Sequence, residues 1–141
     1  MSHTLSYRVP FADTDASGRI HWSSVFRWVE LAEHDLLRAA GVVDVGPFPR
    51  RAAEVSYLRG LAAGDEVEIQ LDVVRIGRTS VTYSWQVTRD HEVCVEGGHT
   101  VVHIDHIGHP TPLPGVIREH PDVCCVGARD SDVQHEKGVC P

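Results

Sequence analysis

The chain has 141 residues, 42% of them hydrophobic and 23% charged, which fits one compact domain with a single core. Its formal net charge is -7, and no segment is rich in Lys and Arg, which argues against nucleic-acid binding. No run approaches the roughly 18 consecutive apolar residues of a membrane span, and the first residues lack the features of a signal peptide. We therefore expect a cytoplasmic protein without membrane contact.

The first half of the chain predicts one short strand and one long helix. Residues 6–11 are partly alternating, and Pro10 limits this strand to a sheet edge or a strand end. After a segment rich in turn-forming residues, apolar residues recur at spacings of three and four, which predicts a helix at about 24–40, with Gly41 just past its end. Because apolar residues extend beyond one face, we expect this helix to be buried on most of its circumference.

Four longer strands are predicted after a break that contains prolines and glycine, at 52–61, 65–77, 78–90 and 93–105. Apolar and polar residues alternate strictly in the middle two, as in a sheet with one face in water. Short turns make the last three strands a meander, and Gly97–Gly98 is expected to mark a bulge. The predicted class is α+β, with an antiparallel sheet of about five strands wrapped around one long central helix.

The end of the chain has frequent Pro and Gly and no sustained period. We therefore predict a domain at 1–117 and a flexible C-terminal tail at 118–141. Three of the four cysteines lie in this tail, and without a C-x-x-C spacing or a secretory context all four are expected to be free thiols.

Three stretches of the chain together resemble the hotdog-fold acyl-CoA thioesterases, in particular the branch typified by 4-hydroxybenzoyl-CoA thioesterase. They are FADTDASGRIHWSSVFRWVELAEHDLL, GDEVEIQLDVVRIGRTSVTYSWQV and HPTPLP, and the D-x-D-x-x-G turn before an aromatic-bearing helix start is the most specific part. The resemblance covers about residues 5–115. It implies a hotdog fold, hydrolysis of an acyl-CoA or acyl-carrier-protein thioester, and no cofactor beyond the coenzyme A of the substrate. It also implies a homodimer or homotetramer with active sites at subunit boundaries.

The resemblance implies that Asp15 is the catalytic residue and that the backbone N–H of Trp22 polarises the thioester carbonyl. A carboxylate ahead of a helix is favoured in its ionised form, and it can activate water or attack the carbonyl directly. The alternative for Asp15 is a turn or capping residue, the role that we expect for Asp13. His21 is a candidate second acid or base, and otherwise a polar residue near the helix start.

Candidate contacts to the substrate come from Arg78, more weakly from Arg75, and from Ser24. The resemblance places phosphate-binding basic residues near Arg78, and a guanidinium suits phosphate because it binds in a bidentate manner. The alternative for both arginines is a solvated charge at a strand end. Ser24 stands where the family pattern has an Asn. Glu30, within the apolar helix, is expected to be buried and paired in a structural role.

Four histidines between positions 99 and 109 invite the hypothesis of a metal site. In a strand, His99 and His103 share one face and His106 lies on the other. No Cys or carboxylate completes a tetrahedral set, so we expect no metal.

Two other functions stay open. One is a hotdog-fold hydratase or dehydratase that uses Asp15 and His21, although the Asn-Pro of that pattern is absent from DASGRIH. The other is a non-catalytic domain that binds acyl-CoA, against which the presence of Asp15 argues.

Overall fold

The computed structural model describes residues 1–120, which form a five-stranded sheet and two α-helices. The strands are β1 (Ser2–Arg8), β2 (Arg50–Tyr57), β3 (Glu66–Ile76), β4 (Ser80–Arg89) and β5 (Glu92–Val102), and the helices are α1 (Ser24–Ala39) and α2 (Gly115–Arg118). The strand order is β1-β3-β4-β5-β2, and every neighbouring pair is antiparallel. The predicted antiparallel sheet of about five strands and the β3-β4-β5 meander are confirmed.

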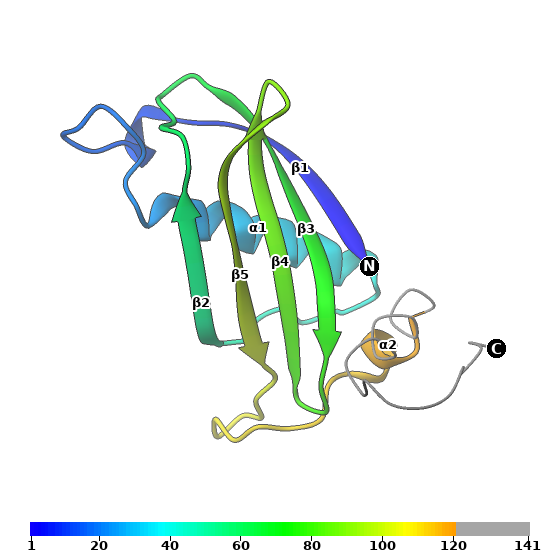
Figure 1. Cartoon of the computed structure of the whole chain (residues 1–141). Coiled ribbons are helices and arrows are strands. Elements are labelled where there is room, and N and C mark those ends of the chain that lie inside the picture. The colour runs from blue at the N-terminus through cyan, green and yellow to red at the C-terminus, as the bar shows by residue number, and fades with distance from the viewer. Residues whose placement is uncertain (121–141) are drawn as a thin grey trace, which may run out of the picture.

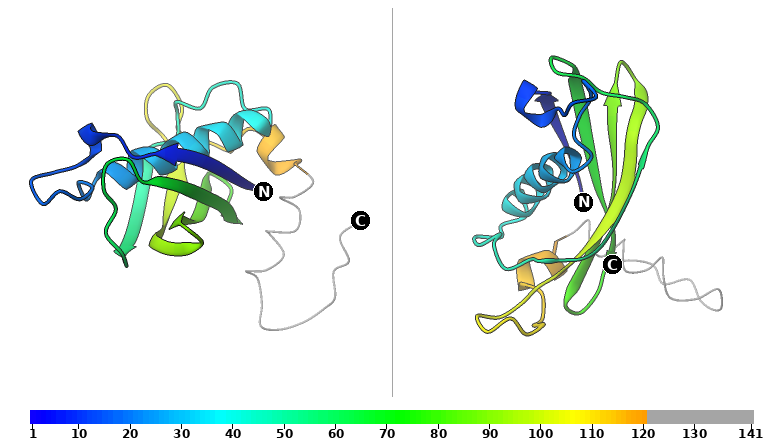
Figure 2. Two further views of the ribbon diagram at one scale, coloured as in Figure 1. Left: turned by 90° about the horizontal axis from the view of Figure 1, so that it is seen from above. Right: turned by 90° about the vertical axis from the view of Figure 1, so that its left-hand side faces the viewer.

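The sheet and α1 form two layers, with α1 lying across one face of the sheet (Figure 1). Seen from the side, the sheet curves toward α1 (Figure 2). The apolar side chains that α1 buries share one face, and they are Val25, Trp28, Val29, Ala32, Leu36 and Leu37. On the opposite face Arg27, Leu31 and Arg38 are exposed. The expected burial of α1 on most of its circumference is therefore not met in the single chain, because the sheet covers only one side of the helix.

The alternation in β3 and β4 places their apolar residues in the core. Buried side chains occupy every second position, at Val67, Ile69, Leu71 and Val73 in β3 and at Val81, Tyr83, Trp85 and Val87 in β4. Burying a large apolar side chain stabilises a fold by roughly 1.5–3 kcal/mol, so these two strands and α1 supply much of the core. This core fixes the helix start against the sheet.

The two glycines of β5 do not form the predicted bulge. The ladders to β2 and β4 pass through Gly97 and Gly98 without a shift of register. A Cβ atom on Gly97 would collide with the carbonyl oxygen of Glu54 and would lie 2.7 Å from the ring of Trp85. Close approach, and not an extra residue, explains the absence of a side chain here.

Several local signals have the expected outcome. β1 is an edge strand that ends at Arg8, ahead of Pro10. Gly41 follows α1 at φ +95°, and its N–H donates to the carbonyl of Arg38. Asp90 and His91, both at positive φ, form the tight turn between β4 and β5.

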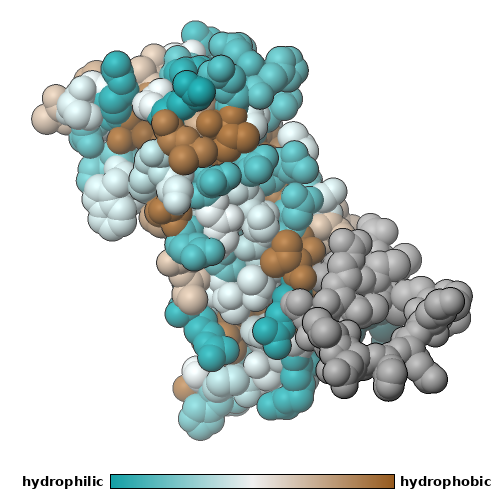
Figure 3. All heavy atoms as spheres, viewed as in Figure 1, coloured by the Kyte–Doolittle hydropathy of each residue, from teal (hydrophilic) through white to brown (hydrophobic). Residues whose placement is uncertain are grey.

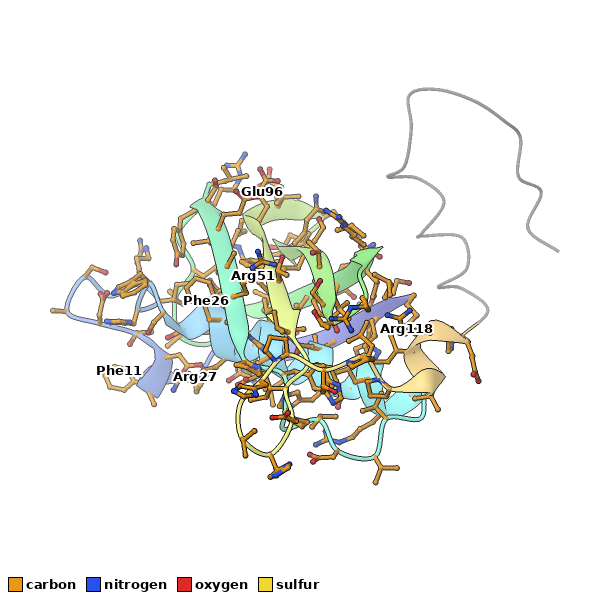
Figure 4. The ribbon with its side chains drawn as sticks, turned by 90° about the horizontal axis from the view of Figure 1, so that it is seen from below. Phe11, Phe26, Arg27, Arg51, Glu96 and Arg118 are labelled. Carbon is orange, nitrogen blue, oxygen red and sulfur yellow. The ribbon has the colours of Figure 1, made fainter. Side chains whose placement is uncertain are left out.

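The short helix α2 packs onto the domain through Ile117, which is fully buried. The guanidinium of Arg118 donates to the carbonyl oxygens of Gly77 and Arg78, so the chain is still attached one residue past the expected boundary (Figure 4). The rest of the predicted tail, residues 121–141 with Cys124, Cys125 and Cys140, lies outside the described residues. Cys94 is a buried free thiol. Within residues 1–120, no helix is both long and apolar enough to cross a membrane.

Candidate active site

Asp15 lies at the base of a tight turn between β1 and α1. Its backbone N–H donates to the carbonyl of Arg19 at 2.9 Å, and its carbonyl accepts from the N–H of Gly18 at 3.0 Å. Gly18 has φ +76°, which glycine adopts readily. The N–H of Ile20 then donates to the carbonyl of Leu61, which attaches the turn to the β2–β3 connection. The D-x-D-x-x-G motif therefore presents Asp15 on a rigid backbone.

The side chain of Asp15 is exposed and has one partner. Its Oδ1 accepts hydrogen bonds from the hydroxyl and from the N–H of Ser17, the latter at 2.8 Å. The Ser17 hydroxyl, and next its amide, hold the pKa of Asp15 below the ordinary value, and the nearby His21 lowers it further. Among the described residues nothing donates to Oδ2. Asp15 therefore carries a charged oxygen that is free to meet a substrate or a water.

Asp13, two residues earlier, is buried and fully paired. Its Oδ2 accepts from the indole N–H of Trp28 at 2.8 Å and from the hydroxyl of Tyr7 at 3.1 Å, and its Oδ1 pairs with Arg27. These partners come from β1 and α1. The geometry supports the interpretation of Asp13 as a structural residue.

The backbone amides just ahead of α1 differ in whether they have an acceptor. The carbonyl of Asp13 accepts from the N–H of His21 at 2.7 Å, and the N–H of Ser23 donates to Nδ1 of His21 at 3.2 Å. The N–H of Ser24 donates to the carbonyl of His21 at 2.9 Å. In the part of the chain that the structure describes, the N–H of Trp22 makes no such bond. The residue predicted to polarise a carbonyl thus has its donor available.

Ser24 and His21 are two further candidate site residues. Ser24 is buried, and its hydroxyl donates to the carbonyl of Asp13 at 2.9 Å, so the structure does not support Ser24 as a substrate contact. The ring of His21 is exposed, with Nδ1 bonded to the Ser23 hydroxyl at 2.7 Å. His21 does not line the cavity described next.

Asp15 and Trp22 line one cavity of about 300 Å³, a size within the usual range of ligand pockets. Its lining residues come from the segment between β1 and α1, from the end of β2 and from the β2–β3 connection, and they are Asp15, Arg19, Ile20, Trp22, Tyr57, Leu58, Arg59, Gly60 and Leu61. The hydroxyl of Tyr57 donates to the carbonyl of Trp22, and burial raises the pKa of Tyr57. The cavity, which we call the Asp15 cavity, combines one carboxylate with two guanidinium groups.

Arg75 is near the end of β3 and Arg78 lies in the β3–β4 turn, and this turn is at the other end of the sheet from the turn between β1 and α1 (Figure 1). Tyr57, beside the cavity, pairs with Val95 near the start of β5, whereas the β3–β4 turn that contains Arg78 adjoins the end of β5 at Val102. Within one chain, neither arginine meets Asp15. Neither arginine lines the Asp15 cavity, and their contact with coenzyme A stays a prediction.

The cationic side chains that the sequence analysis missed are Arg19 and Arg59. Both line the Asp15 cavity. Arg59 pairs with Glu92 at 3.3 Å, whereas Arg19 has no ion pair among the described residues. The signal for Arg19 was its place directly after the D-x-D-x-x-G motif. Arg59 follows β2, and the sequence does not predict which strand β2 pairs with.

A second polar group lies beneath the helix, and here only the predicted burial of Glu30 was wrong, because Glu30 does pair with Arg50 of β2 at 3.5 Å. The side chain of Glu30 is 49% exposed, whereas that of Glu33 is 0% exposed. Glu33 accepts a hydrogen bond of 3.1 Å from Nη1 of Arg50, forms an ion pair of 2.8 Å with Nη2 of the same guanidinium, and lies 2.7 Å from Nε2 of His99. We call Glu33, Arg50 and His99 the Glu33 cluster. It lies on the buried face because position 33 is one helical turn after Val29 and one turn before Leu36 and Leu37, which are buried.

The remaining histidines do not gather. Nδ1 of His103 contacts the carbonyl oxygen of Pro112 at 2.8 Å, and His106 and His109 are exposed in the following loop. Over residues 1–120, no three His, Cys, Asp or Glu side chains are arranged to hold a metal ion.

Comparison with known proteins identifies the family. Residues 9–120 match the thioesterase-like superfamily. The chain belongs to this superfamily. It is 27% identical over 128 residues to a 1,4-dihydroxy-2-naphthoyl-CoA hydrolase of Thermosynechococcus vestitus, covering 81% of this chain and 87% of that protein.

Solved structures share the fold. A thioesterase of Thermus thermophilus, in complex with coenzyme A and zinc, is 30% identical with a TM-score of 0.75, and the match covers 83% of this chain and 94% of that one. A 1,4-dihydroxy-2-naphthoyl-CoA thioesterase of Synechocystis has a TM-score of 0.73 at 17% identity, over 84% of this chain and 93% of that one. The second likeness concerns the fold alone. Together with the superfamily match, these neighbours agree with the predicted hotdog architecture.

Proposed function

We propose that this protein is a thioesterase that hydrolyses an acyl-CoA thioester, with Asp15 as general base or nucleophile. The observation that carries the proposal is that Asp15, a carboxylate with a lowered pKa, lines the same cavity as Trp22, whose N–H has no acceptor among the described residues. The membership in the thioesterase-like superfamily supports it. So does the coenzyme A bound to the 30% identical thioesterase.

The chemistry assigns one task to each group. Asp15 takes a proton from a water that attacks the thioester carbonyl carbon, or attacks that carbon itself to give a mixed anhydride that water then opens. The N–H of Trp22 stabilises the oxyanion that forms on the carbonyl oxygen. When the C–S bond breaks, the thiolate of coenzyme A leaves and takes up the proton, and the acyl group leaves as a carboxylic acid. Every atom in this step comes from the substrate and one water.

Two arginine sets compete for the coenzyme A phosphates. Arg19 lies at the Asp15 cavity without an ion-pair partner among the described residues, and Arg78 with Arg75 would come from a second copy of the chain. A guanidinium binds phosphate by two parallel hydrogen bonds, which suits either set. A carrier protein that bears the same phosphopantetheine thioester is the alternative thiol carrier.

A homodimer or homotetramer is part of the proposal. Strand β2 is the second edge of the sheet, and apart from the half-buried Val55 all its residues are exposed. An open edge strand of this length offers unpaired N–H and C=O groups to a second copy. Light scattering at micromolar concentration should give at least twice the 15.6 kDa chain mass; a monomer mass would contradict this part.

A thiol-release screen tests the activity. Purified protein is mixed with aromatic, short-chain and long-chain acyl-CoA substrates, and free coenzyme A is detected with a thiol reagent. We expect turnover of at least one class. Absence of thiol release with every class, in protein that still binds acyl-CoA, would favour the non-catalytic binding domain. A hydratase would instead act on an enoyl-CoA without releasing thiol.

A further inference from the structure

Tyr57, the last residue of β2, connects the sheet to the segment just ahead of α1. Its hydroxyl donates a hydrogen bond to the backbone carbonyl of Trp22, which lies 35 residues away in the sequence. Both residues line the Asp15 cavity. The chemistry proposed for Asp15 does not use this phenol, so the hydrogen bond needs an explanation of its own.

The backbone around Tyr57 is firmly held. Tyr57 pairs with Val95 in the ladder between β2 and β5. The N–H groups of Leu58 and Arg59 then both donate to the carbonyl of Cys94, at 2.8 and 3.0 Å. Hydrophobic surface gathers toward the end of the sheet where β2 stops (Figure 3), and burial raises the pKa of Tyr57. Tyr57 therefore presents a protonated phenol, which can donate, from a rigid strand end.

The backbone of Trp22 has few other contacts. The peptide plane with its N–H is held on one side, because the carbonyl of His21 accepts from the N–H of Ser24 at 2.9 Å. In the next plane the N–H of Ser23 donates to the ring of His21, which is itself exposed. Among the described residues, only Tyr57 donates to the carbonyl of Trp22. Since the side chain of Trp22 is 63% exposed, the hydrogen bond from Tyr57 is what ties this residue to the sheet.

The direction of the Trp22 N–H depends on how firmly these two peptide planes are held. A donor stabilises an oxyanion well only within about 2.7–3.1 Å of it. A misplacement of about 1 Å can lower a rate by about 100-fold. The hydrogen bond from Tyr57 therefore matters more for the geometry of catalysis than for the stability of the fold.

Building on the proposed function, we infer that Tyr57 is a positioning residue for thioester hydrolysis. Its hydroxyl fixes the backbone of Trp22, so that the Trp22 N–H meets the oxyanion as it forms. Tyr57 acts through Trp22 and does not itself bind the carbonyl of the substrate. Its loss should lower kcat and leave KM nearly unchanged, because the full oxyanion exists only in the transition state.

The Tyr57→Phe variant removes the hydroxyl and keeps the ring. Benzoyl-CoA, butyryl-CoA and palmitoyl-CoA represent the three substrate classes, and the one with the highest kcat/KM is used throughout. We expect kcat to fall about tenfold, less than the loss of about 100-fold or more when an oxyanion donor is removed outright. Tyr7→Phe, which removes the hydroxyl bonded to Asp13, is the matched control and should lower stability while leaving kcat unchanged.

Infrared spectroscopy reports on the hydrogen bond from Trp22 directly. Asp15→Asn protein is saturated with the same acyl-CoA, which carries an isotope label at the thioester carbonyl. A hydrogen bond to this carbonyl lowers its stretching frequency. Adding Tyr57→Phe should move the band to higher frequency and broaden it, because the donor is no longer fixed. Adding Tyr7→Phe should leave the band in place.

The outcomes separate the inference from the proposed function. An unchanged kcat in Tyr57→Phe, or equal losses in Tyr57→Phe and Tyr7→Phe, overturns the inference. A lower kcat with an unmoved band also overturns it, because Tyr57 would then act on the substrate directly. If the unmodified protein releases no thiol from any of the three substrates, the thioesterase proposal fails. The carbonyl band of bound benzoyl-CoA then still decides whether Tyr57 positions Trp22.

Discussion

Asp13 and Asp15 stand two residues apart in one turn, and the structure gives them opposite surroundings. Asp13 is buried against donors from β1 and α1, whereas Asp15 is exposed and bonded only to Ser17 among the described side chains. A carboxylate that already satisfies several donors stabilises the fold but has no oxygen left for chemistry. A carboxylate with one free oxygen beside an unpaired amide can react. Position relative to the helix start, and not residue type, decides the difference.

Replacing Asp15 should break catalysis and leave the fold intact. Asp15→Asn keeps the acceptor for Ser17 and removes the charge, so kcat should fall by about 100-fold or more, the usual scale of general-base catalysis. Steady-state thiol release on the best acyl-CoA measures the effect. Urea unfolding should be nearly unchanged, since the side chain is exposed. If most of the turnover remained, Asp15 would be a turn residue only.

Replacing Asp13 should destabilise the fold and leave catalysis nearly intact. Asp13→Asn weakens the bonds to Trp28 and Tyr7, and because Arg27 is largely exposed its ion pair contributes little. We expect a loss of about 2 kcal/mol in the free energy of unfolding, from hydrogen bonds to a buried charged group. Urea titration measures it, with Asp15→Asn as the matched control. A kcat loss as large as that of Asp15→Asn, in folded protein, would contradict the contrast.

The local parts of this contrast were predictable from the sequence. The period of α1, the alternation in β3 and β4 and the cap at Gly41 depend on neighbouring residues, and all three have the expected outcome. The role of Asp15 came from the resemblance, and its chemistry stays a prediction. The D-x-D-x-x-G turn alone is equally compatible with a capping residue.

The non-local parts were not predictable. The glycines of β5 were assigned to a bulge because the approach of Glu54 and Trp85 depends on two neighbouring strands. Glu33, and not the predicted Glu30, is the buried glutamate of α1. Which of the two is buried depends on the side of α1 that meets the sheet, and an apolar stripe wider than one face does not define that side. Arg50 and His99, far apart in sequence, meet Glu33 only once the sheet order is known.

Replacing the arginines tests which of them binds the coenzyme A phosphates, with a smaller expected effect than that of Asp15→Asn. If Arg19 binds the coenzyme A phosphates, Arg19→Ala should raise KM for acyl-CoA about tenfold, in line with one lost charge-assisted contact of roughly 1.4 kcal/mol. The pantetheine thioester without the nucleotide is the control and should be less affected. Arg78→Ala, at the other end of the sheet, should show the same pattern only if a second chain completes the site. If a variant raised KM equally for both thioesters, the replaced arginine would not bind the phosphates.

The smallest effect concerns the pKa of Asp15. The Ser17 hydroxyl is the main group that lowers this pKa, and the Ser17 amide is the next. A lowered pKa means that Asp15 stays ionised, and competent as a base, until the pH falls through that value. Ser17→Ala removes the hydroxyl and keeps the amide, so the pKa should rise toward the ordinary value of about 3.9. The acid limb of kcat/KM should then move to higher pH, with little change at pH 7, where Asp15 is ionised in both proteins.

Ser23→Ala, which removes a hydroxyl bonded to His21 and not to Asp15, is the control and should leave the limb in place. An acid limb that moved equally in both variants would show that another group sets it, and Asp15 would lose its place as the base.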